Sequence, residues 1–208
     1  STRTRAQNLS GPKQDDASKK SQYVIVLDAG HGGKDEGAVS DDGKLEEKEY
    51  NLAVVKEIAR LLEQSGVKVY CTRTTDRTVS KKARVRLANK RQADMLVSVH
   101  CNASDARKHS VRGIEVLYSK RDNGAGYTNK QLAAKLLKKT VAATGLPARG
   151  VIRREDLYLM HHAKVPAVIV ETGYLTNPSD CLYMRQEKGI RQTAWGIYQA
   201  VMETLEKY

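Results

Sequence analysis

The sequence predicts an α/β fold: a single layered domain with a mostly parallel, twisted sheet of about six strands and helices on both faces. The main observation is that short apolar runs alternate with segments whose apolar residues repeat at helical spacing. This alternation is typical of a parallel sheet covered by helices. The second observation is the length of 208 residues without an internal repeat, which is enough for one sizeable core.

The domain is expected to begin at residue 23. Residues 1–22 are polar and rich in Ser, Lys, Asp and Gln, a composition that predicts a disordered linker or tail. The folded domain is then expected over residues 23–208. Its first element is the apolar run YVIVLD, residues 23–28, which predicts a buried strand. A loop with five glycines follows, up to Gly43.

A helix and a second strand follow the glycine-rich loop. Apolar residues at helical spacing predict a helix that ends at Gly66. These apolar residues are Leu52, Val55, Ile58, Ala59 and Leu62. The run VKVYC, residues 67–71, predicts the second strand, and TRTTD after it predicts a loop. Ser80 is expected to cap a basic helix that extends to about Gln92.

Two more strands and a capped helix occupy the middle of the chain. The runs MLVSVH, residues 95–100, and GIEVLYS, residues 113–119, predict the third and fourth strands. Thr128 and Gln131 form a capping box before a helix built on leucines. Gly145 is expected to end that helix.

The last elements are a fifth strand and a closing helix. AVIVE, residues 167–171, is the fifth apolar run, and a helical pattern extends from about Gln186 to Glu206. In α/β folds, ligands bind beyond the carboxyl ends of the strands. The residues at those ends are therefore the candidate site.

Three apolar runs each deliver a reactive side chain at the carboxyl end. His31 follows the first strand by three residues, His100 closes the third, and Glu171 closes the fifth. A single histidine at a strand end is more often a hydrogen-bonded structural residue. However, a carboxylate after AVIV is expensive to bury unless it is paired, metal-bound or protonated. Two histidines and a carboxylate form a typical zinc site with an open fourth position.

The carboxylate that completes the ligand set stays open at this point. Glu46, Glu47 and Glu49 all precede the first predicted helix. Acidic residues there are also favoured by the helix dipole, which is the simpler explanation. The residues alone do not choose among the three.

Four motifs in order resemble those of a known enzyme family. DAGHGG, EEKEYNL, SVHCNA and VPAVIVETGYLTNPS together resemble the zinc-dependent N-acetylmuramoyl-L-alanine amidases of bacterial cell walls, over roughly residues 23–206. In that family the first His, the Glu of E-K-x-x-N-L and the His of S-x-H-x-N bind zinc. The resemblance thus implies one zinc ion per chain on His31, Glu47 and His100.

The resemblance also implies the reaction. It places the catalytic glutamate at Glu171, as the general base for hydrolysis of the amide between N-acetylmuramic acid and L-alanine of the stem peptide. The family often has an Arg where this chain has His161, so contacts with substrate at that corner are expected to differ. The segment between Ser119 and Thr128 is too short for the helical insertion that occludes the site in some members, which predicts an open site.

Four further residues are expected around this site. Asp28 and Asn102 are candidates to accept or donate hydrogen bonds that orient the ligands, although Asp28 would serve equally as a loop cap. Arg73 and Arg84 are candidates to bind carboxylates of the glycan or stem peptide, with surface salt bridges as the alternative.

Charge indicates the kind of partner. The chain has a net charge of +12, which predicts attraction to an anionic cell-wall polymer, with simple solubility as the alternative. No aromatic-studded surface motif is present and phenylalanine is absent, so nucleic acid is not expected as a partner. Three cysteines without a C-x-x-C pair argue against a structural zinc knot and a disulfide framework.

The predicted setting is the cell wall, the periplasm or the spore envelope, with peptidoglycan as substrate and the chain as a monomer. No apolar run approaches the roughly 18 residues that span a bilayer, which predicts a soluble domain. Because the chain begins with Ser1 and shows no signal sequence, we expect a membrane anchor or a targeting partner outside it. Two alternatives remain: a zinc peptidase or deacetylase acting on another substrate, and a non-catalytic module that binds the wall through its basic face.

Overall fold

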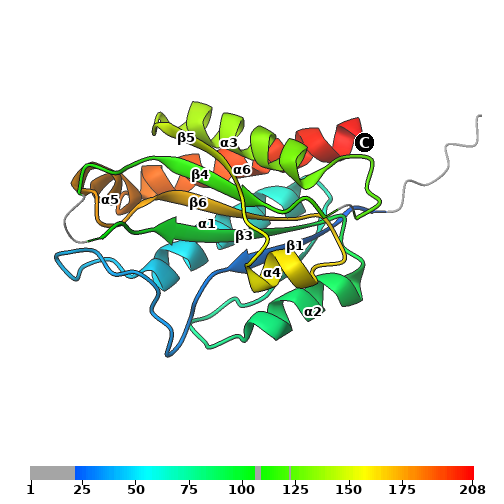
Figure 1. Cartoon of the computed structure of the whole chain (residues 1–208), viewed down its shortest axis with the longest axis horizontal. Coiled ribbons are helices and arrows are strands. Elements are labelled where there is room, and N and C mark those ends of the chain that lie inside the picture. The colour runs from blue at the N-terminus through cyan, green and yellow to red at the C-terminus, as the bar shows by residue number, and fades with distance from the viewer. Residues whose placement is uncertain (1–21, 106–108, 122) are drawn as a thin grey trace, which may run out of the picture.

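Six strands form one sheet in the order β2-β1-β3-β6-β4-β5 (Figure 1). This computed structural model describes residues 22–105, 109–121 and 123–208, so the predicted tail lies, except for its last residue, outside the described residues. The strands are β1 (Val24–Ala29), β2 (Lys68–Cys71), β3 (Met95–Asn102), β4 (Ile114–Tyr118), β5 (Ala148–Arg153) and β6 (Ala167–Tyr174). All neighbours are parallel except β4 and β6, which confirms the mostly parallel sheet.

Helices cover both faces of the sheet, as predicted. They are α1 (Glu47–Gln64), α2 (Lys81–Arg91), α3 (Asn129–Thr144), α4 (Tyr158–His162), α5 (Pro178–Met184) and α6 (Glu187–Lys207). The helices α1, α3 and α6 pack on one face, and α2 and α4 pack on the other. The Ser80 side chain caps α2, and Thr128 and Gln131 form the capping box of α3. None of the helices within the described residues is long and apolar enough to cross a membrane.

One strand and two short helices were not predicted from the sequence. The strand β5, with the sequence ARGVIR, lies at the edge of the sheet and is mostly exposed, so it has no apolar run to reveal it. The helix α4 has five residues and α5 has seven, too few for a helical pattern to stand out. The start of α5 was nevertheless readable, because Asn177 caps it and Pro178 occupies its first turn.

The two faces of the sheet are covered unequally. The core beneath α1, α3 and α6 is much larger than the cluster beneath α2 and α4, which is built on residues such as Val26, Leu96 and Ile169. The short helix α4 leaves the carboxyl ends of β1, β3 and β6 uncovered on this face. A cavity of about 310 Å³ opens there, lined by residues of these strands and of α2 and α4.

Candidate active site

The first predicted ligand lies on a strained turn directly after β1. His31 adopts a φ of 60°, a left-handed conformation that is uncommon for a residue with a side chain. Gly30 precedes it, and a Cβ at this position would overlap the imidazole ring of His100. The turn therefore needs a glycine at position 30, and its geometry brings the two histidine rings to a centroid distance of 4.9 Å.

Two buried arginines hold this turn from behind. Arg73 donates hydrogen bonds to the carbonyls of Ala29 and Gly30 at 3.0 and 2.9 Å. Arg84 donates to the carbonyls of Ala29 and His31 at 2.6 and 2.8 Å. The predicted contact of Arg73 with substrate carboxylates is wrong, because Arg73 is 1% exposed and donates its hydrogen bonds to backbone carbonyls. Arg84 borders the cavity, but its guanidinium is likewise engaged within the protein.

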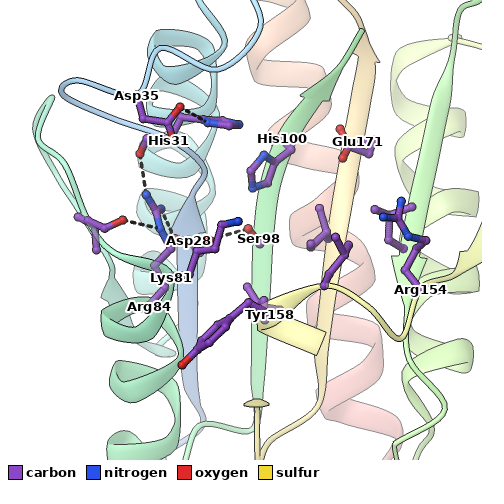
Figure 2. Close-up of a pocket in the computed structure, with 15 residues that line it drawn as sticks. Asp28, His31, Asp35, Lys81, Arg84, Ser98, His100, Arg154, Tyr158 and Glu171 are labelled. Atoms are coloured by element: carbon purple, nitrogen blue, oxygen red, sulfur yellow. Dashed lines mark hydrogen bonds and ion pairs between the residues drawn. The ribbon is translucent and has the colours of Figure 1, made fainter. Parts of the chain in front are cut away.

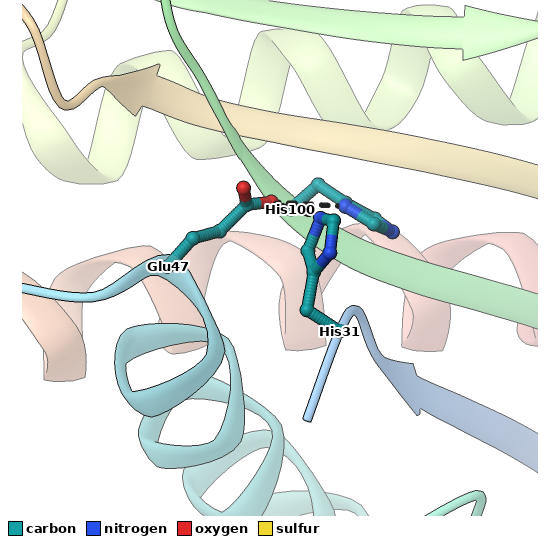
Figure 3. A group of neighbouring side chains, drawn as sticks. All are labelled: His31, Glu47 and His100. Carbon is teal, nitrogen blue, oxygen red and sulfur yellow. Dashed lines mark hydrogen bonds and ion pairs between the residues drawn. The ribbon is translucent and has the colours of Figure 1, made fainter. Parts of the chain in front are cut away.

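The three predicted metal ligands converge from three different elements (Figure 3). His31 follows β1, Glu47 is the first residue of α1, and His100 lies near the end of β3. Glu47 Oε1 lies 3.1 Å from His31 Nε2 and 3.0 Å from His100 Nδ1. One potential donor atom from each residue lies within 4.8 Å of the others. Glu46 and Glu49 are not part of this cluster.

The carboxylate in this cluster is fixed and charged. Glu47 is 3% exposed, and its oxygens accept hydrogen bonds from the backbone N–H groups of Cys101 and Ala38 at 3.0 and 2.8 Å. Burial opposes its charge, but hydrogen bonds and charge from His100 and His31 outweigh burial and hold the pKa of Glu47 well below its usual range. The cluster thus offers an anionic oxygen between two imidazole nitrogens, which is the donor set that zinc prefers.

Asp35 orients the first histidine. Its Oδ1 atom accepts a hydrogen bond from Nδ1–H of His31 at 2.8 Å, so Nε2 is left free to face Glu47. Metal-binding histidines commonly donate their second ring N–H to a carboxylate in this way. Asp35 was not predicted from the sequence, because its contact with His31 depends on the path of the glycine-rich loop and no spacing rule marks it.

Glu171 lies beside this cluster, as predicted. It is the register partner of His100 in the parallel pair of β3 and β6. Among the described residues, no hydrogen-bond partner reaches its buried Oε2 atom. Burial raises the pKa of the Glu171 carboxyl to about 7, while His100 opposes this rise and Glu47 adds to it. A carboxyl group with a pKa near neutrality can both accept and release a proton.

The structure corrects the role predicted for Asp28. Its carboxylate is 1% exposed, and it accepts hydrogen bonds from the hydroxyls of Thr72 and Ser98 and from Arg84, each at 2.6 Å. Burial alone would raise its pKa, but Arg84 and the hydroxyls outweigh burial and hold the pKa of Asp28 below its usual value. Asp28 contacts neither ligand histidine. It anchors Arg84, which in turn holds the carbonyl of His31.

Asn102 likewise has partners other than the ligands. It donates to the Tyr174 hydroxyl at 3.1 Å and to Glu115 at 3.3 Å. Glu115 also accepts from Arg149 at 2.5 Å and is the antiparallel register partner of Glu171. This group of polar side chains thus borders the catalytic candidate on the β4 side. Glu115 was not predicted from the sequence. The available signal was the strand alternation in GIEVLYS, which places Glu115 on the same face of β4 as Leu117.

The cavity extends from the cluster along the uncovered face of the sheet (Figure 2). Asp28 and Ser98 lie below the two histidines, and Arg154 stands on the β4 side, below Glu171 in this view. His161 is exposed and does not line the cavity. No described residue between positions 119 and 128 lines it either, as the prediction of an open site requires.

Comparisons with known proteins identify the family to which this chain belongs. The sequence profile of the N-acetylmuramoyl-L-alanine amidase family, Amidase_3, matches residues 25–203. The chain belongs to this family. The catalytic domain of the amidase CwlV from Bacillus (Paenibacillus) polymyxa var. colistinus has 33% sequence identity and a TM-score of 0.82, covering 89% of this chain and 99% of that one.

Two curated members of the family are longer than this chain. The amidase LytC of Bacillus subtilis is 36% identical over 163 residues, which cover 78% of this chain and 32% of LytC. The probable cell wall amidase LytH of Staphylococcus aureus is 36% identical over 187 residues, which cover 89% of this chain and 58% of LytH. The chain therefore spans about a third of LytC and just over half of LytH.

Proposed function

We propose that this chain hydrolyses the amide bond between N-acetylmuramic acid and L-alanine in peptidoglycan, with one zinc ion held by His31, Glu47 and His100. The observation that carries the proposal is the convergence of these three donors beside the buried carboxyl group of Glu171, at the end of an open groove. The family to which the chain belongs supports the choice of this bond.

Glu171 is the proposed general base. Zinc at the cluster would supply a Lewis acid that favours the ionisation of water and polarises the amide carbonyl. The Glu171 carboxylate accepts the proton of the attacking water and then donates it to the departing amine nitrogen as the C–N bond breaks. The products are the lactyl carboxylic acid and a free stem peptide that begins with L-alanine. Asp35 holds the His31 ring in a single orientation throughout.

Digestion of purified peptidoglycan tests this function. Mass spectrometry is expected to find intact stem peptides that start at L-alanine, and their release is expected to stop with a chelator and resume with zinc. A zinc peptidase or deacetylase would leave the muramoyl–alanine bond intact, and a wall-binding module would bind without cleaving. Glu171→Ala is expected to retain zinc and to lose activity by about 10²–10⁴-fold, the usual contribution of a general base.

We also propose where the chain acts. A muramoyl amide is present outside the cytoplasmic membrane, so the chain is expected to act as a monomer in the cell wall, the periplasm or the spore envelope. The net charge of +12 supports binding to an anionic wall polymer. Recovery of all the protein in a cytoplasmic fraction would contradict this location.

A further inference from the structure

The groove beside the metal cluster is suited to a short peptide. Its cavity extends from His31 and His100 to Leu157 and Tyr158 on the α4 side, and its volume of about 310 Å³ is at the small end of ligand sites. Leu117 contributes to an apolar lining. A cavity of this size holds a few residues of a substrate next to the reacting bond.

Most charged groups that line this groove are already paired within the protein. Asp28 pairs with Arg84 at 2.6 Å, and Asp35 pairs with His31 at 2.8 Å. Arg154, across the groove, makes two hydrogen bonds of 2.8 Å with the carboxylate of Asp156. These groups line the groove, but each already has an ion-pair partner within the protein.

Lys81 differs from them. It is the first residue of α2, it is exposed, and it lines the cavity. Within the parts of the chain that the structure describes, no carboxylate forms an ion pair with its ammonium group. Figure 2 shows its side chain reaching into the groove from the α2 side, below His100 and across from Arg154. The groove therefore presents one available ammonium group to whatever enters it.

We propose that Lys81 is a specificity residue that binds a carboxylate of the stem peptide, so that muramoyl peptides with a free carboxylate close to the scissile amide are preferred over amidated ones. This inference rests on the proposed function. An ammonium group forms a stronger hydrogen bond with a carboxylate than with the neutral oxygen of a carboxamide. Leu117 and Ile169 line the same groove as Lys81 and offer apolar contacts to the rest of the peptide.

Two synthetic muramoyl tripeptides test the inference. They differ only in the second peptide residue, which carries either a free α-carboxylate or the corresponding amide. The zinc-loaded wild type is expected to cleave the free acid with a kcat/KM roughly ten-fold higher, the size of one charge-assisted hydrogen bond in a half-open groove. Lys81→Ala is expected to remove this preference by raising KM for the free acid alone. The lost contact would hold the bound substrate and the transition state equally, so kcat is expected to stay unchanged.

Lys82→Ala is the matched control. Lys82 is the next residue, is also exposed and does not line the cavity, so this variant is expected to keep the wild-type preference. Equal kcat/KM of the wild type for both peptides would overturn the inference and leave the proposed function intact. Equal loss on both peptides in Lys81→Ala would also overturn it. If the wild type cleaves neither peptide, both the proposed function and this inference are wrong.

Discussion

Replacing the candidate base with its neutral isostere is expected to stabilise the metal-free protein. Glu171 is half-buried, no described group donates a hydrogen bond to its buried Oε2 atom, and burial raises its pKa from 4.5 to about 7. Between pH 4.5 and about pH 7 the folded protein keeps a proton on Glu171 that the unfolded chain has lost. Stability of the wild type therefore falls as pH rises through this window, and the whole loss is present above pH 7.

The size of this loss follows from the change in pKa. A rise from 4.5 to about 7 corresponds to about 3 kcal/mol of unfolding free energy. Glutamine has a similar shape and no charge at any pH, so Glu171→Gln removes the loss. The gain in stability is expected to be near zero at pH 4.5 and about 3 kcal/mol at pH 8. For a domain of this size the gain at pH 8 is a rise in Tm of roughly 6–12 °C.

Thermal unfolding of chelator-treated protein at pH 4.5 and pH 8 measures this difference. Glu115→Gln is the control, because Glu115 faces Glu171 across β4 and β6 but is paired with Arg149 at 2.5 Å. This control is expected to lose stability at pH 8. The reasoning is refuted if Glu171→Gln changes Tm equally at both pH values, or lowers it at pH 8.

Three further predictions concern the turn that carries the first histidine and the basic helix. Gly30→Ala is expected to abolish zinc retention after dialysis, because its Cβ would overlap the His100 ring; wild-type metal content would contradict this. Arg73→Lys keeps the charge but loses the forked contacts with backbone carbonyls, so zinc affinity in chelator competition is expected to fall roughly ten-fold, and an unchanged affinity would argue against this role. Lys82→Glu combined with Arg86→Glu is expected to reduce retention on an anionic wall polymer at low salt while turnover of soluble muropeptide stays unchanged, and equal retention would remove α2 as the binding face.

The fold was predictable where strands are buried on both sides. The strands β1, β3 and β6 read as continuous apolar runs because helices cover both of their faces. The strand β5 escaped prediction because one of its edges has no neighbour and its side chains are mostly exposed. The other edge strand, β2, was predicted because three of its four residues are half-buried, whereas four of the six residues of β5 are exposed.

The site was predictable to the extent that it depends on strand ends. His31, His100 and Glu171 meet because parallel strands deliver their carboxyl ends to one edge of the sheet. The supports of these residues could not be read in this way. Asp35 reaches His31 only through the path of a loop, and Arg73 looked like a surface cation although it is buried behind that loop.

A general reason explains why arginines lie behind this turn. Once the chain leaves β1, the carbonyls of residues 29–31 need hydrogen-bond donors where the strand ladder no longer provides all of them. A guanidinium group offers five N–H donors in a rigid fork and serves several carbonyls at once. Arg84 does so while Asp28 neutralises its charge, which keeps a buried cation acceptable. The sequence shows the two charges, but only the fold shows that they face each other.

Two features of the site destabilise the fold, and the hydrogen bonds of the two arginines stabilise it. The left-handed backbone of His31 is a sparsely populated conformation that costs about 1–3 kcal/mol, and the buried carboxyl of Glu171 lowers stability near neutral pH. Both features serve the proposed chemistry, since one directs an imidazole toward Glu47 and the other keeps a proton exchangeable near pH 7. The hydrogen bonds of Arg73 and Arg84 offset the strain of the turn. Substitutions that relieve the buried carboxyl should therefore stabilise the fold and remove activity together, whereas substitutions of the arginines should reduce both.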